Sequence, residues 1–129
     1  METINFEDFI KLEIRIGKIL AAERVEGSDK LMKLEVDFGF ETVALPAEGG
    51  SETPKTEQKP IIRQIVAGIA KFYTPEALIG KECPFAYNLA PRSLKGLESQ
   101  GMILCPSDST SGPVLLHPDK EIELGSLVK

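Results

Sequence analysis

The stretch that decides the fold is IIRQIVAGIAKFYTPEALIGKECPFAYNL, residues 61–89. It opens with a β-branched run from Ile61 to Ile69, which predicts a strand. Thr74 then provides a helix cap, followed by a proline at the first helical position, and Gly80 ends the helix. Residues 83–89 read as another strand. The stretch therefore predicts a strand, a short helix and a second strand.

Working outward, the flanking sequence adds more short strands. Apolar and polar residues alternate over residues 12–16, and the apolar run that follows extends this strand to about residue 22. The same alternation predicts a strand over 34–38. Downstream, residues 102–105 and 114–116 read as two short strands. Before the first strand, Asn5 is expected to cap a short helix whose apolar face holds two phenylalanines and an isoleucine.

These elements predict an all-β fold built as a small antiparallel barrel. The helix between the third and fourth strands fits an OB-fold, a five-stranded barrel, with a short N-terminal helix and C-terminal extension strands. Periodicity alone leaves an SH3-like barrel or a β-sandwich fragment open. With 129 residues, the chain is expected to be one domain. Residues 46–60 contain three prolines, two glycines and almost no large apolar side chain, which predicts a flexible inserted loop.

Composition narrows the possible functions. The net charge is −5, but it divides into −5 over residues 1–59, +2 over 60–105 and −2 over 106–129. An acidic chain is not a typical nucleic-acid binder, so the small positive excess matters only if it coincides with a site. No apolar run is long enough to span a membrane, and no secretory signal precedes the fold. Two cysteines in such a chain indicate reduced thiols and a cytoplasmic protein. One histidine and two widely spaced cysteines predict no zinc site, and we expect no metal or cofactor.

The segment from Asn88 to Met102 is the most distinctive in chemical terms. Arg92 and Lys95 can contact phosphates, and this segment joins the fourth and fifth strands, a place that OB-folds use for oligonucleotides. Asn88, Ser99 and Gln100 offer neutral donors and acceptors suited to base edges or ribose hydroxyls. The alternative is an ordinary surface loop with two solvated cations.

Several short motifs, in one order along the chain, resemble the tRNA-binding domain family. The family includes domains of methionyl-tRNA synthetases, stand-alone structure-specific tRNA-binding proteins and the endothelial-monocyte-activating polypeptide module. The matching pieces are Phe6-Glu7-Asp8-Phe9, residues 12–19, 27–31, 65–70, 73–81, Asn88-Leu89-Ala90-Pro91-Arg92 and Ser99-Gln100-Gly101-Met102-Ile103-Leu104.

The resemblance implies an OB-fold that forms a homodimer and binds tRNA by shape. It also implies a possible partner, the catalytic chain of a methionyl-tRNA synthetase, and leaves open whether the chain stands alone or is part of one. By matching position, the ligand-facing residues would be Asn88, Arg92, Lys95, Ser99, Gln100 and Met102. Three further cations, Lys30, Lys33 and Arg63, would extend a phosphate track.

Catalysis is not expected, because aminoacylation needs an ATP-binding domain and the chain has no glycine-rich phosphate loop followed by lysine. We therefore expect a non-catalytic tRNA-binding module that captures tRNA for aminoacylation. Two rivals remain open at this point. One is a secretion-type chaperone of the same fold that binds unfolded proteins, and the other is a purely structural dimerisation domain.

Overall fold

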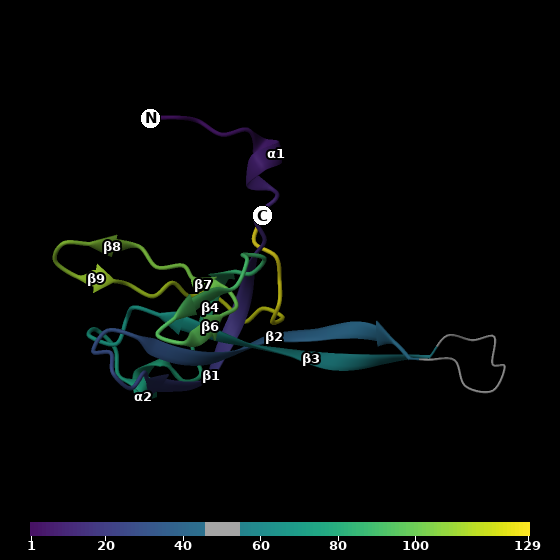
Figure 1. Ribbon diagram of the computed structural model, residues 1–129. Helices are drawn as coiled ribbons and strands as arrows, with labels where there is room; N and C mark the ends of the chain where they lie inside the picture. Colours follow the sequence, from purple (N-terminus) through teal and green to yellow (C-terminus); the bar gives the residue numbers. More distant parts are fainter. Residues whose placement is uncertain (46–54) are drawn as a thin grey trace.

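The structure is a computed structural model that describes residues 1–45 and 55–129 (Figure 1). The elements are α1 (Phe6–Phe9), β1 (Ile14–Arg24), β2 (Met32–Ala44), β3 (Thr56–Ala67), α2 (Pro75–Leu78), β4 (Glu82–Ala86), β5 (Arg92–Leu94), β6 (Leu97–Ser99), β7 (Met102–Ile103), β8 (Ser107–Asp108) and β9 (Gly112–Pro113). Over the described ranges, no helix is long and apolar enough to cross a membrane.

Five strands form one curled antiparallel sheet in the order β3-β2-β1-β4-β7. The side chains on its inner face form the core, including Ile19, Leu34, Ile65 and Phe85, which have almost no exposed surface. The predicted all-β fold class is therefore confirmed, and the arrangement is that of an OB-like barrel. The helix α2 lies between β3 and β4 along the chain, as the sequence predicts.

Local signals explain where α2 begins and ends. The Thr74 hydroxyl accepts a hydrogen bond from the Ala77 N–H at 3.3 Å, and Gly80 ends the turn with a φ of +88°. Leu78 is fully buried in the core. The Gly80 N–H donates to the Ile19 carbonyl at 2.7 Å, so the end of the helix is fixed to β1.

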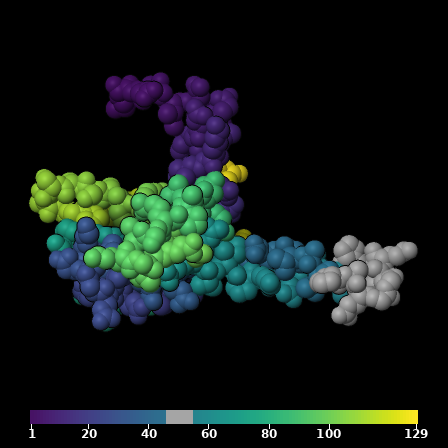
Figure 2. Space-filling model, in the orientation of Figure 1, coloured from purple at the N-terminus to yellow at the C-terminus, as the bar shows by residue number. Residues whose placement is uncertain are grey.

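The strands β2 and β3 run beyond the barrel as a two-stranded arm that projects from the body (Figures 1 and 2). The pairing continues from Phe40 opposite Pro60 to Ala44 opposite Thr56. The predicted loop over 46–60 is therefore wrong at its end, because residues 56–60 belong to β3; residues 46–54 lie outside the described part. The arm has no buried face, so its sequence lacks the apolar alternation that marks a strand, and a proline is tolerated on an edge strand.

Two glycines set the point at which the arm leaves the barrel. On the N-terminal side of Lys18, β1 no longer pairs with β2 but with the C-terminal segment, and the Gly125 N–H donates to the Ile16 carbonyl at 2.7 Å. Gly39 and Gly125 have φ of +89° each. A Cβ on Gly125 would overlap the Phe38 carbonyl, and one on Gly39 would overlap the Leu124 carbonyl. Only glycine allows this close crossing of two backbones.

The region after β7 differs from the prediction. Residues 114–116 do not form a strand; instead, a turn that follows Asp108 joins the short strands β8 and β9. The Asp108 carboxylate accepts from the Ser111 N–H at 2.5 Å and the Thr110 N–H at 3.0 Å. These backbone donors, that of Ser111 first, hold the pKa of the exposed Asp108 below its usual value. The residue types of this turn can be recognised in the sequence, whereas the ends of the strands depend on which segments pair.

The helix α1 stands away from the barrel (Figures 1 and 2). Asn5 occupies the N-cap position, but its side chain makes no capping bond; its carbonyl accepts from the Asp8 N–H instead. Phe6 is 72% exposed, and Phe9 and Ile10 are also exposed. The predicted apolar face exists, yet α1 has no buried residue within this chain.

Candidate nucleic-acid interface

The segment expected to be the binding loop contains a hairpin, β5–β6. Leu94 pairs with Leu97, and the two residues between them, Lys95 and Gly96, have φ of 51° and 78°. Two successive positive φ values characterise the tight turn that matches strand twist, and Lys-Gly between two leucines is its sequence signal. The turn places Lys95 at the exposed tip.

Two leucines hold the hairpin against the barrel. Leu94 and Leu97 pack on a small cluster formed by Val25, Leu31 and Val66, which is separate from the main core. This cluster fixes the hairpin beside the ends of β1, β2 and β3. The position of Lys95 is therefore set by the fold and not by a free loop.

Ser99 lies inside the molecule, with 1% of its surface exposed. Its hydroxyl accepts from the Val66 N–H at 3.0 Å and donates to the Gly101 carbonyl at 2.9 Å. These bonds satisfy the outer edge of β3, where no other strand of residues 1–45 and 55–129 pairs. The expectation that the Ser99 side chain faces RNA therefore conflicts with its burial, and its role is to help close the barrel.

Gln100 also helps to close the barrel. Its Oε1 accepts from the Gln64 N–H at 3.0 Å, and its own N–H donates to the Gln64 carbonyl at 2.8 Å. The Gln64 side chain in turn donates to the Glu98 carbonyl at 2.9 Å. One end of the Gln100 amide is thus engaged by β3, and its Nε2 makes no hydrogen bond to the residues described.

Arg63 is held by its neighbours. Its Nη1 donates to the Tyr87 carbonyl at 2.5 Å and to the Gln100 carbonyl at 3.4 Å. The guanidinium also lies 3.6 Å from the centre of the Tyr87 ring, a cation–π contact. Most of the hydrogen-bonding capacity of Nη1 is used inside the protein, but the positive charge remains at the surface of the groove described below.

Asn88 connects the barrel to the N-terminal segment. Its Oδ1 accepts from the Glu13 N–H at 2.7 Å, and its Nδ2 donates to the Lys11 carbonyl at 2.6 Å. Both ends of the amide are therefore occupied by the linker between α1 and β1. Sequence reasoning recognised Asn88 as distinctive, but the bonds that it makes are to residues about 75 positions away.

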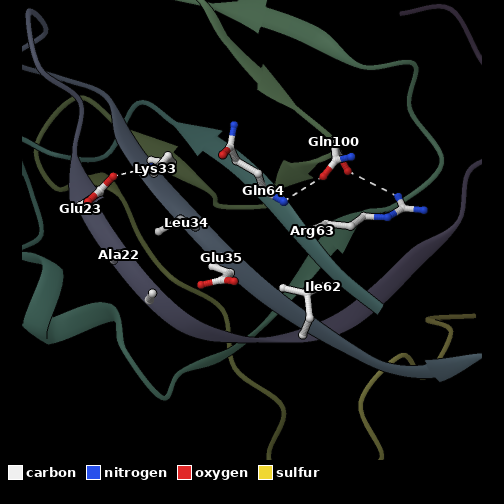
Figure 3. A pocket seen from close by; sticks show the side chains of 10 residues that line it. Ala22, Glu23, Lys33, Leu34, Glu35, Ile62, Arg63, Gln64 and Gln100 are labelled. Atoms are coloured by element: carbon white, nitrogen blue, oxygen red, sulfur yellow. Dashed lines mark hydrogen bonds and ion pairs between the residues drawn. The ribbon is translucent and has the colours of Figure 1, made fainter. Parts of the chain in front are cut away.

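A groove with a volume of about 470 Å³ runs over the outer face of β1, β2 and β3 (Figure 3). Lys33 and Arg63 line it together with two acids, Glu23 and Glu35, and Lys33 forms a salt bridge with Glu23. The charges of the groove are therefore balanced. Its lining residues are Ala21, Ala22, Glu23, Lys33, Leu34, Glu35, Ile62, Arg63, Gln64 and Gln100.

A second depression continues this groove toward the hairpin. It shares Glu23 and Lys33 with the first and adds Arg24 and Lys95. Together the two form a continuous surface, called the outer groove below. Arg24 was missed by sequence reasoning; its Nη1 donates to the Ala70 carbonyl at 2.7 Å, and nothing in its local sequence marks it.

The nine predicted residues do not all meet on one surface. Lys33, Arg63, Gln100 and Lys95 line the outer groove. Arg92 and Met102 line a different depression, which Gly68 and Pro113 also border. Of the three others, Lys30 is exposed at the turn between β1 and β2, Ser99 is buried, and Asn88 lies at the N-terminal linker.

Comparisons with known proteins identify the family of this chain. A family model described as "Putative tRNA binding domain" matches residues 55–127. The chain is 44% identical over 99% of its length to a methionine–tRNA ligase of Caldanaerobacter subterraneus subsp. tengcongensis, and 43% identical over 100% to one of Methanosarcina mazei. It spans only 17% and 15% of those two enzymes.

Solved structures give the same result. A MetRS-related protein from Pyrococcus horikoshii superposes with a TM-score of 0.78 at 31% identity, covering 100% of both chains. The chaperone CsaA from Bacillus anthracis str. Ames gives 0.75 at 30%, covering 99% of this chain and 100% of that one. The family model covers more than half of the residues and the sequence relatives span the whole chain, so this chain belongs to the putative tRNA-binding domain family.

Proposed function

We propose that the chain is a non-catalytic module that captures folded tRNA through the outer groove and the tip of the β5–β6 hairpin. The observation that carries the proposal is the continuity of this surface: Lys33, Arg63, Arg24 and Lys95 line it in a chain that belongs to a tRNA-binding family. Cations at successive positions along a groove suit a sugar–phosphate backbone.

Recognition by shape fits the polar groups of the outer groove better than recognition of bases. The amides that could read base edges are largely occupied: Gln100 Oε1 accepts from the Gln64 N–H, and both ends of the Asn88 amide bond to the N-terminal linker. What remains is four cations among three acids, Glu23, Glu26 and Glu35, and cations contact phosphates regardless of sequence. Glu23 and Glu35 beside these cations favour weak, salt-sensitive binding.

The module acts as a homodimer in this proposal, with α1 as part of the contact. Phe6, Phe9 and Ile10 are exposed on α1, which projects from the body (Figure 2). A four-residue helix does not hold its conformation alone in water, so it needs a partner surface. A second copy of this chain would cover the apolar face and place two outer grooves on one particle.

The partner enzyme in this proposal is a methionyl-tRNA synthetase. The relatives are methionine–tRNA ligases, of which this chain spans a small part. A tRNA-binding module attached to an enzyme, or bound beside it, raises the local tRNA concentration without taking part in the chemistry. The chain would serve either as a segment of such an enzyme or as a separate protein.

Sedimentation velocity tests the dimer and the tRNA interaction in one experiment. At concentrations of tens of micromolar and about 100 mM salt, the chain alone is expected to sediment as a dimer, and folded tRNA to form a faster species with it. Unstructured RNA of the same length is the control and is expected to bind more weakly. If the chain sediments as a monomer, only the dimer part of the proposal is refuted. Equal binding of both RNAs would refute recognition by shape.

A second candidate function is a chaperone for unfolded proteins. The similarity to a chaperone, CsaA, and the exposed apolar side chains of α1 favour it. A chaperone should suppress aggregation of a chemically unfolded protein. Bound tRNA should compete with the unfolded protein only if the two ligands share a surface. Failure to suppress aggregation would exclude this function.

A further inference from the structure

The register of β4 with β7, continued past the end of β7, brings the two cysteines opposite each other. The ladder between β4 and β7 pairs Ala86 with Met102 and Phe85 with Ile103. One step further, the Leu104 N–H donates to the Pro84 carbonyl at 3.1 Å, so the two chains stay antiparallel beyond the end of β7. The next pair in this register is Cys83 and Cys105.

The hydrogen-bonding pattern puts this pair at a close position. Hydrogen-bonded and non-hydrogen-bonded pairs alternate along an antiparallel ladder, and Leu104 with Pro84 carries the hydrogen bond. The cysteines therefore occupy a non-hydrogen-bonded site, where Cα atoms lie about 4.5 Å apart and side chains are closest. Disulfides span Cα separations of about 4.4–6.8 Å, so backbone geometry permits a bond.

Both thiols also point toward the same part of the interior. Cys83 is fully buried in the main core cluster, and Cys105 is partly buried and packs against that cluster. Both are free cysteines. No described group of histidine, cysteine, aspartate and glutamate could hold a metal ion, which leaves the pair without a metal-binding role in that part of the chain.

We propose that Cys83 and Cys105 form a reversible intramolecular disulfide when the protein meets a peroxide. Hydrogen peroxide oxidises the thiolate of the more accessible Cys105 to a sulfenic acid and is itself reduced to hydroxide. The sulfur of Cys83 then attacks Cys105, an S–S bond forms, and the hydroxyl group leaves with the Cys83 proton as water. A dithiol reductant reverses the reaction.

The surroundings make this reaction slow. Burial is the main cause that raises the pKa of the Cys83 thiol to about 12; Cys105 and Glu82 also raise it, and Lys81 lowers it. Burial also raises the pKa of the Cys105 thiol. Few molecules hold a thiolate at neutral pH, so oxidation follows sustained exposure to peroxide and not a brief pulse. The disulfide is therefore a slow response that strengthens the fold.

The bond would close a loop around the hairpin and the barrel-closing residues. Residues 84–104 lie between the cysteines and include β5, β6, Ser99 and Gln100. Cross-linking the ends of such a loop restricts the unfolded chain and stabilises the folded one. The oxidised protein is expected to melt roughly 5–10 °C higher than the reduced protein.

Mass spectrometry of the full chain before and after hydrogen peroxide tests the proposal. After blocking of free thiols with iodoacetamide in denaturant, the oxidised chain is expected to carry no label and to yield one peptide pair that joins Cys83 to Cys105, whereas the reduced chain is expected to be labelled at both cysteines. The melting temperature of the same sample should rise, and dithiothreitol should reverse both changes. Because the two redox states are compared in one protein, no substitution can confound the result.

Single-cysteine variants supply the control. In Cys83→Ala, Cys105 has no partner and is expected to proceed to sulfinic acid, with no rise in melting temperature. In Cys105→Ser, Cys83 is expected to remain a free thiol after peroxide treatment and to react with iodoacetamide only once the chain is unfolded. Free thiols in the oxidised parent, Cys105 overoxidised beside a free Cys83, or bonds formed only between separate chains would each overturn the proposal. None of these outcomes bears on tRNA binding.

Discussion

Reversing the charge of Lys95 with Lys95→Glu is expected to weaken the binding of folded tRNA about tenfold at physiological salt. Lys95 lies at the tip of the tight β5–β6 turn and lines the same surface as Lys33. The substitution removes one phosphate contact and adds repulsion beside Glu23 and Glu26, which already lie there. Filter binding across a range of salt concentrations measures the affinity. The slope of log affinity against log salt concentration should become less steep by about one.

The matched control is Lys120→Glu, which changes the net charge by the same amount. Lys120 lines a separate depression with Lys18, Lys81 and His117, and this depression shares no residue with the outer groove. Its reversal is expected to change the affinity less than twofold, because contacts beyond a Debye length of about 8 Å are screened. Equal losses in both variants would show that only the overall charge matters and that the outer groove is not the site.

Replacing Gly125 with alanine is expected to lower the free energy of unfolding by about 3 kcal/mol or more. The residue has a φ of +89°, and the added Cβ would overlap the Phe38 carbonyl. The C-terminal segment must then move away from β1, which breaks the bond from the Gly125 N–H to the Ile16 carbonyl and the bond from the Ile16 N–H to the Ser126 carbonyl. Urea denaturation followed by circular dichroism measures the change.

Gly27→Ala separates steric overlap from backbone strain. Gly27 also has a positive φ, +81°, but a Cβ there would have no atom within 4 Å. Strain alone is expected to cost about 1 kcal/mol at this position. If Gly125→Ala were no more destabilising than Gly27→Ala, the C-terminal segment would not be fixed against the base of the arm.

The barrel could be predicted from local sequence because its signals are local. Thr74 and the proline after it determine where α2 begins, and the apolar alternation over 12–16 and 34–38 marks strands with one buried face. The arm could not be predicted, because the signal that defines it is not local. Residues 56–60 form a strand that buries nothing, so only the pairing with β2, not the composition, reveals it.

The candidate site was predicted less well because the same residue types serve the fold. The sequence analysis selected Asn88, Ser99 and Gln100 for their hydrogen-bonding groups. Each side chain accepts a hydrogen bond from distant backbone, in the N-terminal linker or in β3. Periodicity and composition carry no information about such long-range bonds. Lys95 is different, since an exposed lysine is rarely recruited into the core and stays available for a ligand.

The measurement that tests the central claim most directly is lysine acylation of the free and tRNA-bound protein, read by mass spectrometry. If folded RNA lies in the outer groove, Lys95 and Lys33 lose reactivity when tRNA saturates the protein, while Lys81 and Lys120, on the separate depression, react as before. Protection of Lys81 and Lys120 with unchanged reactivity at Lys95 would place the RNA on another face and contradict the account.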